Sequence, residues 1–333
     1  MIGLAKTAAG PGGLALMERP RRPLATGEVR LDVHGAGVCG TDLHIEAGEM
    51  ECVPPVTLGH EVAGVVSELG AGVDAEWLGA RVVTETYYAT CGRCPLCRRG
   101  RPNLCPWRRS IGIHVDGGFA AQVVVPALNL HRVSDGVELH AAALAEPLAC
   151  VCHCLLDPSV VGPRDAVLVI GPGPIGLLAA QVARACGGEV LVGGLPRDAA
   201  RLALARSLGL EVTEEPSARE SFDVVLECSG SASGVAAALA SVRRGGRMVQ
   251  IGIYGTPVHV PFDEMLLKEV DVRTGYASTP PSWLRAMTLI ERGDVQLAPL
   301  VSGVVPLAAF ADAFADLRAG RAAKLVFDPR LDG

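Results

Sequence analysis

The sequence lacks the marks of a membrane protein or a secreted protein. No apolar run approaches the roughly 18 to 20 residues that a membrane-spanning helix needs. The N-terminal stretch MIGLAKTAAGPGG lacks the charged and then apolar layout of a signal peptide. We therefore expect a cytoplasmic protein with no membrane partner.

Excess positive charge is also missing. The 36 Asp and Glu residues outnumber the 30 Lys and Arg residues, and the net charge is −6 at pH 7. This balance argues against nucleic acid or an anionic membrane surface as the main partner. The chain is long enough for a sizeable core, with 333 residues of which 49% are hydrophobic. Because single cores rarely grow beyond roughly 250 to 300 residues, we expect two domains.

The pattern of apolar residues changes near residue 149. Before it, short alternating or β-branched runs such as EVRLDVHGAG lie between Gly and Pro turn signals, which predicts a β-rich domain. After it, apolar runs of strand length such as AVLVIG alternate with helical stretches such as IGLLAAQVARACG. Alternating strands and helices predict a doubly wound parallel sheet, so the expected fold class is α/β.

A glycine-rich turn, GPGPIG, joins the strand expected at 166–170 to the helix that follows it. It carries Gly171, Gly173 and Gly176. Dinucleotide binding needs a tight turn, a close backbone approach to pyrophosphate and a helix N-terminus that faces the anion. A G-x-G-x-x-G pattern alone matches any glycine-rich turn, but the strand before it and the helix after it favour dinucleotide binding.

Four of the eleven cysteines lie within fifteen residues, in CGRCPLCRRGRPNLC. Cys91, Cys94, Cys97 and Cys105 are spaced C-x2-C-x2-C-x7-C, and four thiolates at such spacing can enclose a tetrahedral zinc ion. In a reducing compartment clustered cysteines are more often metal ligands than disulfides, and the thioredoxin-like context of a redox motif is absent. We expect a structural zinc site. The arginines around it suggest a nucleic-acid patch as an alternative, but the only interleaved aromatic residue is Trp107, so a solvated basic lobe is favoured.

A second set of possible ligands is dispersed along the chain. One Cys, one His and one carboxylate from distant segments, with water in the last position, would make an open, catalytic zinc site. No spacing rule proves such a site, and a lone His or Glu is more often structural. The candidates in GVCGTDLH, TLGHE and LAEPLACVCHC are Cys39, Thr41, Asp42, His44, His60, Glu61 and Glu146.

The order of these motifs resembles the zinc-dependent medium-chain alcohol dehydrogenases, especially their sorbitol (polyol) and threonine dehydrogenase branches. The motifs are GHE, the four-cysteine lobe, GGFAAQVVVP, EPLACVCH and VLVIGPGPIG, and the similarity covers essentially the whole chain. The resemblance implies a GroES-like catalytic domain and a Rossmann dinucleotide-binding domain. The expected boundaries are 1–148 for the first part of the catalytic domain, 149–277 for the Rossmann domain and 278–333 for the return to the catalytic domain.

The resemblance also implies an oxidoreductase that contains two zinc ions per chain and transfers hydride between a secondary alcohol and NAD(P). Cys39, His60 and Glu146 would bind the catalytic zinc, and Glu61 would be the nearby carboxylate that can approach the metal during ligand exchange. Thr41 would take the alcohol proton and pass it through the cofactor ribose to His44.

The same residues also have structural interpretations. Thr41 can be a turn or cap hydroxyl, and His44 can be a surface histidine. Asp42, which the resemblance places as acceptor of the other N–H of His60, can be a helix cap in GTDLH.

The candidate contacts of the cofactor lie in the second half of the chain. Arg201 matches the family arginine that packs beside the adenine. The full set is Gly171, Gly173, Pro174, Ile175, Gly176, Gly194, Arg197, Arg201, Ser229 and Ile251.

One position departs from the pattern of NAD-binding relatives, in which an acidic residue ends the second strand roughly 20 residues after the glycine turn and binds the ribose hydroxyls. Here the position holds Gly193, Gly194 and Leu195. The missing carboxylate removes a repulsion against a 2′-phosphate, and Arg197 is close enough in sequence to pair with one. We expect NADP to be preferred over NAD. The alternative is that Asp198 swings back to bind the ribose.

Two other classes of protein are weaker interpretations. A zinc-independent medium-chain reductase would lack the Cys, His and Glu set. A zinc-containing nucleic-acid-binding or non-enzymatic protein would not need GPGPIG together with Thr41 and His44. The substrate stays open among polyols, amino alcohols, diols and cyclitols. The branch suggests a homodimer or homotetramer that pairs through the sheet edge near VDVRTGYA.

Overall fold

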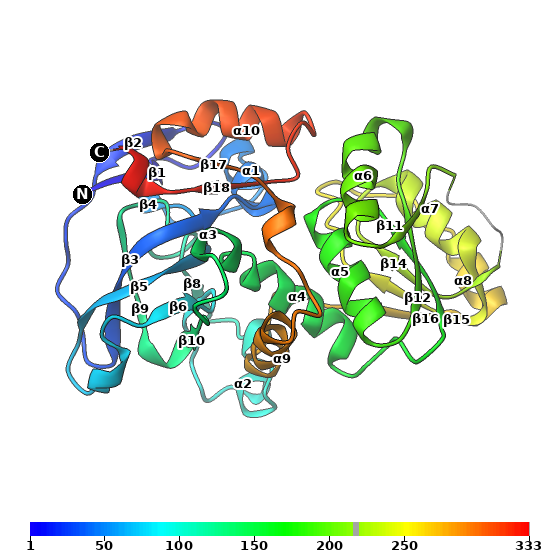
Figure 1. Ribbon diagram of the computed structural model, residues 1–333, viewed down its shortest axis with the longest axis horizontal. Helices are drawn as coiled ribbons and strands as arrows, with labels where there is room; N and C mark the ends of the chain where they lie inside the picture. The colour runs from blue at the N-terminus through cyan, green and yellow to red at the C-terminus, as the bar shows by residue number, and fades with distance from the viewer. Residues whose placement is uncertain (216–219, 333) are drawn as a thin grey trace. The chain divides into compact units, whose positions relative to one another are not determined.

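The structure is a computed structural model that describes residues 1–215 and 220–332. The chain divides into two compact units (Figure 1), of which unit 1 is Met1–Glu146 with Val301–Gly333 and unit 2 is Pro147–Leu300. The boundary at residue 146 falls inside helix α4 (Ala145–Leu156). Together the units give the expected α/β fold class, which is confirmed.

Unit 1 is rich in short strands. Its strands are β1 (Ile2–Lys6), β2 (Leu14–Glu18), β3 (Glu28–Gly37), β4 (Val56–Thr57), β5 (Glu61–Leu69), β6 (Arg81–Thr84), β7 (Tyr87–Ala89), β8 (Arg109–Ser110), β9 (Gln122–Pro126), β10 (Leu130–Arg132), β17 (Val301–Val305) and β18 (Lys324–Phe327). Its helices are α1 (Gly40–Ala47), α2 (Pro95–Arg98), α3 (Leu139–Ala142) and α10 (Phe310–Arg318). Within the described residues, the largest sheet has seven strands in the order β10-β6-β5-β3-β18-β17, with β9 also paired to β3.

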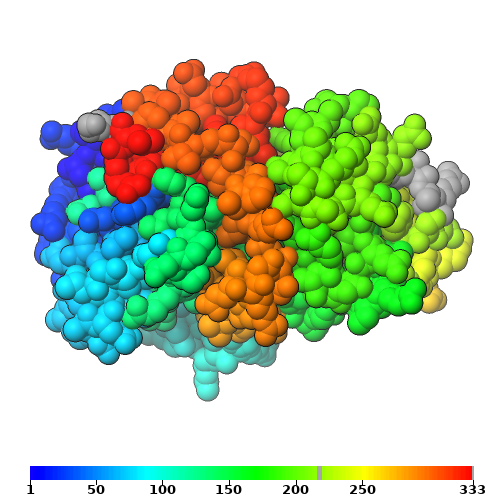
Figure 2. Space-filling model, in the orientation of Figure 1, coloured from blue at the N-terminus to red at the C-terminus, as the bar shows by residue number. Residues whose placement is uncertain are grey.

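β3 is the central strand of this sheet. It pairs with β5 and β9 along its length and with β18 at its end, and most of its residues are buried. The aromatic rings of Phe119 and Phe327 meet edge to face in the core, 4.9 Å apart. The returning segment thus joins strands from the start of the chain, and Figure 2 shows the red C-terminal residues beside the blue N-terminal ones.

Unit 2 alternates strands with helices. Its strands are β11 (Ala166–Ile170), β12 (Glu189–Gly193), β13 (Glu211–Thr213), β14 (Phe222–Glu227), β15 (Val242–Gln250) and β16 (Asp271–Thr274). Its further helices are α5 (Pro174–Ala185), α6 (Ala199–Ser207), α7 (Ala232–Ser241), α8 (Phe262–Lys268) and α9 (Pro280–Glu291). In the described residues these strands form one parallel sheet in the order β13-β12-β11-β14-β15-β16. The strand order reverses between β11 and β14, which is where open parallel sheets bind their ligands.

One apolar segment corrects a sequence expectation. In the described part of the chain, Leu139–Leu156 is a helical stretch of 18 residues with mean hydropathy 1.6, long and apolar enough to cross a membrane. The expectation that no run reaches that length is therefore wrong. This stretch is 78% buried inside the protein, as the core helix of a folded domain is. Its buried leucines, Leu144, Leu148 and Leu155, and small residues such as Ala141 and Ala149 account for its apolar character.

Candidate metal centres and dinucleotide site

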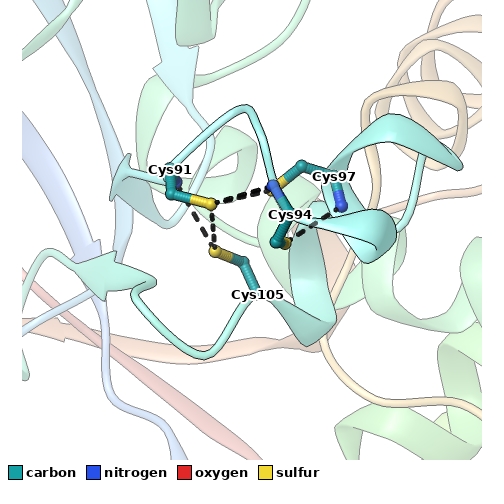
Figure 3. Close-up of side chains that lie close together, drawn as sticks. All are labelled: Cys91, Cys94, Cys97 and Cys105. Carbon is teal, nitrogen blue, oxygen red and sulfur yellow. Dashed lines mark hydrogen bonds between the residues drawn. The ribbon is translucent and has the colours of Figure 1, made fainter.

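The four cysteines of the lobe at 91–105 converge on one point (Figure 3). All four Sγ atoms lie within 4.8 Å of one another, and Cys91 Sγ is 3.6 Å from Cys105 Sγ and 4.0 Å from Cys97 Sγ. A tetrahedral zinc ion with Zn–S bonds of about 2.3 Å requires sulfur atoms separated by roughly 3.8 Å. The spacing fits a closed zinc site, and none of the described cysteines forms a disulfide.

Backbone N–H groups stabilise negative charge on these sulfur atoms. The N–H of Cys94 donates to Cys91 Sγ at 3.3 Å, and the N–H of Cys97 donates to Cys94 Sγ at 3.4 Å. The N–H groups of Arg93 and Cys94 lower the pKa of Cys91 to about 6. Because thiolates and not thiols bind zinc, this backbone arrangement prepares the lobe for the metal.

A second group of ligand atoms gathers where α1 begins and β5 begins. Cys39 is the N-cap of α1, and His60 and Glu61 lead into β5. One ligand atom from each of Cys39, His60 and Glu61 lies within 4.8 Å of the others. Burial alone would lower the pKa of His60, but the charges of Cys39, Asp42 and Glu146 raise it well above its usual value. The imidazole therefore lies in a strongly negative environment.

Glu146, the third ligand that the resemblance implies, lies beside this group. Among the described residues, the set within 4.8 Å contains Glu61 and does not contain Glu146. Glu146 Oε1 instead accepts a hydrogen bond of 2.6 Å from Thr86 Oγ1. Burial raises the pKa of Glu146, while the nearby His60 opposes that rise. Two buried carboxylates thus flank Cys39 and His60, one from each of two distant segments.

Two residues that sequence reasoning missed hold Glu61 in place. Lys324 Nζ on β18 donates to Glu61 Oε1 at 2.5 Å and to the Val38 carbonyl at 2.8 Å. Gly37 on β3 lies between the two strands, and a Cβ there would collide with the Glu61 carboxylate. The sequence signal for this pair is Lys324 itself, a lysine near the end of a lysine-poor chain. The structure shows that it is buried.

The pocket fits a cation. Among the described residues, His60 Nδ1, Glu61 Oε2 and Asp42 Oδ1 are buried and have no hydrogen-bond partner. Three buried carboxylates, those of Asp42, Glu61 and Glu146, face one buried ammonium and one imidazole. Buried polar groups without partners are costly, and Cys, His and carboxylate are the ligands that zinc prefers. The donor set therefore suits zinc.

Helix α1 carries the two residues expected to move a proton. Thr41 is its second residue and is half-buried, and no hydrogen bond of its hydroxyl occurs among the described residues. His44 is 35% exposed, and its Nδ1 lies 2.6 Å from Glu49 Oε2. Asp42 Oδ2 accepts the Cys39 N–H at 2.9 Å, as a helix cap does, and its Oδ1 is 3.9 Å from His60 Nδ1. At that distance the carboxylate and the imidazole form an ion pair and not a hydrogen bond.

In unit 2 the glycine turn has the conformation that its motif predicts. Gly171 follows β11 with φ of 99°, a left-handed value that favours glycine. Gly173 is the N-cap of α5, with Pro174 and Ile175 in the first turn of the helix. A Cβ at Gly176 would collide with the Gly171 carbonyl. The turn thus presents a helix N-terminus at the reversal of strand order.

Two further predicted contacts lie at the ends of neighbouring strands. Ser229 follows β14, and a Cβ at Gly171 would lie 2.8 Å from its Cα. Ile251 follows β15, and its N–H donates to the Glu227 carbonyl at 2.9 Å. The fully buried Glu227 carboxylate, which sequence reasoning missed, accepts the Ser229 N–H at 2.9 Å and Gln250 Nε2 at 2.6 Å. It ties the ends of β14 and β15 together.

The end of β12 is where a dinucleotide's adenosine ribose is expected. Gly194 is buried and Arg197 is exposed. The carboxylate of Asp198 turns back, accepting the Leu195 N–H at 3.0 Å and pairing with Arg201 Nη1 at 3.7 Å. The acidic group therefore lies near the strand end but is already engaged by two partners.

Comparison with known proteins identifies the family of the chain. Residues 25–135 match the family described as alcohol dehydrogenase GroES-like domain, and residues 174–292 match the one described as zinc-binding dehydrogenase. The chain is 36% identical to the sorbitol dehydrogenase of Halalkalibacterium halodurans, over 99% of each chain. It is 34% identical to the L-threonine 3-dehydrogenase of Streptomyces avermitilis, over 98% of this chain and 99% of the relative.

A solved structure from Sinorhizobium meliloti 1021, described as a zinc-binding dehydrogenase bound to NADP, is similar over the whole fold. It superimposes with a TM-score of 0.90 at 31% identity, covering 98% of this chain and 99% of the other.

Metal analysis of single-cysteine variants tests the two centres. The wild-type chain should hold two zinc ions, because two separate ligand groups are present. Cys94→Ser should lose one ion and unfold at a clearly lower temperature, since a closed zinc site contributes folding energy. Cys39→Ser should lose the other ion with a smaller change in the unfolding temperature. Cys52→Ser, outside both groups, is the control; a wild-type protein with one zinc ion would contradict the two-centre interpretation.

Proposed function

Since the chain belongs to the zinc-containing medium-chain alcohol dehydrogenase family and is an NAD(P)-dependent dehydrogenase acting on CH–OH groups, we propose that it oxidises a secondary alcohol flanked by a hydroxyl or amino group. The sorbitol and threonine dehydrogenases among its relatives support this substrate class, which includes polyols, amino alcohols, diols and cyclitols. The close group of the half-buried Cys39 with the buried His60 and a buried carboxylate is the observation that carries the proposal. A cytoplasmic location stays a prediction.

In this proposal Cys39, His60 and Glu146 hold the catalytic zinc, which supplies Lewis-acid chemistry by lowering the pKa of the substrate hydroxyl. Glu61, held by Lys324, is the spare carboxylate at the same pocket. Thr41 would accept the hydroxyl proton, and His44, whose exposed ring is held by Glu49, would release a proton to solvent. Gly171, Gly173 and Gly176 cradle the pyrophosphate in unit 2.

A panel of alcohols tests the substrate class. Initial rates with polyols, threonine-like amino alcohols, vicinal diols and cyclitols, each with NAD⁺ and NADP⁺, should show activity confined to alcohols that have a neighbouring polar group. Simple secondary alcohols without that group are the control. Equal kcat/KM for 2-butanol and its best diol analogue would contradict the proposed substrate class.

Removing the Thr41 hydroxyl tests the proton path. Thr41→Ala should lower kcat by about 100-fold or more while changing cofactor affinity little, because the hydroxyl acts only during proton transfer. Thr41→Ser is the control and should retain most of the rate. His44→Ala should be milder, because water can replace the imidazole at the exit. Unchanged kcat in Thr41→Ala would remove Thr41 from the path.

For the cofactor we propose a preference for NADP, with Arg197 as the partner of the 2′-phosphate. The support is that Arg197 is exposed, that β12 ends in glycine, and that Asp198 is engaged by Leu195 and Arg201. A guanidinium and a phosphate can form a bidentate, charge-assisted pair. In the alternative, Asp198 leaves its partners and binds a ribose hydroxyl of NAD. This alternative predicts a preference for NAD.

Steady-state kinetics with both cofactors separates these two alternatives. Arg197→Ala should reduce kcat/KM for NADP⁺ roughly 10- to 100-fold and leave that for NAD⁺ nearly unchanged, since only NADP has the 2′-phosphate. Arg206→Ala on the exposed face of α6 is the matched control and should change neither value. A wild-type preference for NAD⁺ that Arg197→Ala does not alter would show that the Asp198 carboxylate binds a ribose hydroxyl of NAD.

We also propose that two copies pair through β16, the strand at the edge of the parallel sheet. An edge strand presents unpaired backbone groups. Beside it, α8 exposes Phe262, Leu266 and Leu267 with 72%, 74% and 71% of their surface accessible. Exposed apolar side chains at a sheet edge are typical of a subunit interface.

Light scattering on charged variants of α8 tests this interface. Leu266→Glu together with Leu267→Glu should shift the protein toward a smaller assembly, because burying two carboxylates in an interface is costly. Leu284→Glu, at a leucine on α9 with 64% of its surface exposed, is the control and should keep the wild-type mass. A wild-type monomer, or a double variant of unchanged mass, would place the interface elsewhere.

A further inference from the structure

Thr86 lies against the carboxylate of Glu146. Its Oγ1 donates to Glu146 Oε1 at 2.6 Å, and only 8% and 6% of the two residues' surfaces are exposed. A carboxylate has two oxygens, each able to accept hydrogen bonds or bind a metal. The hydroxyl of Thr86 therefore holds one of the two oxygens of Glu146.

The position of the Thr86 hydroxyl is fixed by the backbone around it. Thr86 forms the bend between β6 and β7, and its carbonyl accepts the Ile111 N–H at 3.0 Å. On the other side, the Glu85 N–H donates to the Asn129 carbonyl at 3.0 Å, and the Glu85 carboxylate lies 3.1 Å from His131 Nε2. A short loop that is bonded on both sides has little freedom to move its side chain.

We propose that Thr86 is a positioning residue for the catalytic metal, holding Glu146 in the orientation from which it binds zinc. This inference rests on the proposed function, in which Glu146 is a zinc ligand. Hydrogen-bond partners of ligating groups fix the orientation of those groups, and losing one typically costs 10- to 100-fold in metal affinity. Thr86 is the hydroxyl that the structure places in that role.

The same hydrogen bond separates the roles of the two carboxylates at the pocket. Glu61 Oε1 is held by a buried ammonium, that of Lys324, whereas Glu146 Oε1 is held by a neutral hydroxyl. A charge-assisted pair draws more electron density from a carboxylate than a neutral hydrogen bond does. In this proposal Glu146 binds the metal, and Glu61, held by Lys324, is the alternative carboxylate at the pocket.

The rate of zinc loss to a chelator tests the proposal without any assay of turnover. Thr86→Val keeps the shape of the side chain and removes its hydroxyl. We expect it to release one of its two zinc ions about 10- to 100-fold faster than the wild type, while the second ion leaves at the wild-type rate. Thr86→Ser retains the hydroxyl and should behave as the wild type.

Three outcomes would overturn the proposal: wild-type release of both ions from Thr86→Val, faster release of both ions together, and equally fast release from Thr86→Ser. Thr86→Ala, which cannot overfill the site, provides the same measurement if Thr86→Val does not fold.

A Glu146 variant distinguishes failure of this proposal from failure of the proposed function. Glu146→Ala should release the same single ion at least as fast as Thr86→Val. If Glu146→Ala retains both ions at the wild-type rate, the assignment of Glu146 as a ligand is wrong. If Glu146→Ala loses an ion and Thr86→Val does not, the ligand assignment stands and only the role of Thr86 is wrong.

Discussion

The ion pair between Lys324 and Glu61 is the interaction on which the metal pocket of unit 1 depends. The two residues lie on β18 and β5, on either side of β3, and reach each other across Gly37 because that position has no side chain. Both are buried, so each needs the other to offset the loss of hydration. The pair joins the returning segment of the chain to the strand that follows His60, and it gives Glu61 a fixed place beside Cys39.

Features that are local in sequence could be predicted well. The four cysteines of the lobe and the three glycines of the turn lie within short stretches, where spacing alone restricts what the backbone can do. The α/β class followed from the change of apolar period near residue 149, and the family followed from the order of its motifs. The cysteine lobe and the glycine turn needed only the neighbours of each residue along the chain, and the fold class and the family needed only the order of such local patterns.

Features that depend on strand register could not be predicted. Lys324, Thr86 and Gly37 meet the catalytic group only because β18, β3 and β5 pair as they do and because the bend before β7 faces Glu146. The same reason applies to Glu227, since its partner Gln250 is the last residue of a different strand, β15. The stretch Leu139–Leu156 escapes a search for apolar runs because His140, Glu146 and His153 interrupt it, although its mean hydropathy is high.

The interruption of unit 1 by unit 2 has a consequence for how the protein is made. Cys39, His60, Glu61 and Glu146 leave the ribosome early, but Lys324 follows only after the whole of unit 2 has been synthesised. Until then β3 lacks its neighbour β18, and the carboxylate of Glu61 has no ammonium to pair with. The nascent metal pocket therefore stays open to water throughout the synthesis of unit 2, and it closes only when the returning strand docks.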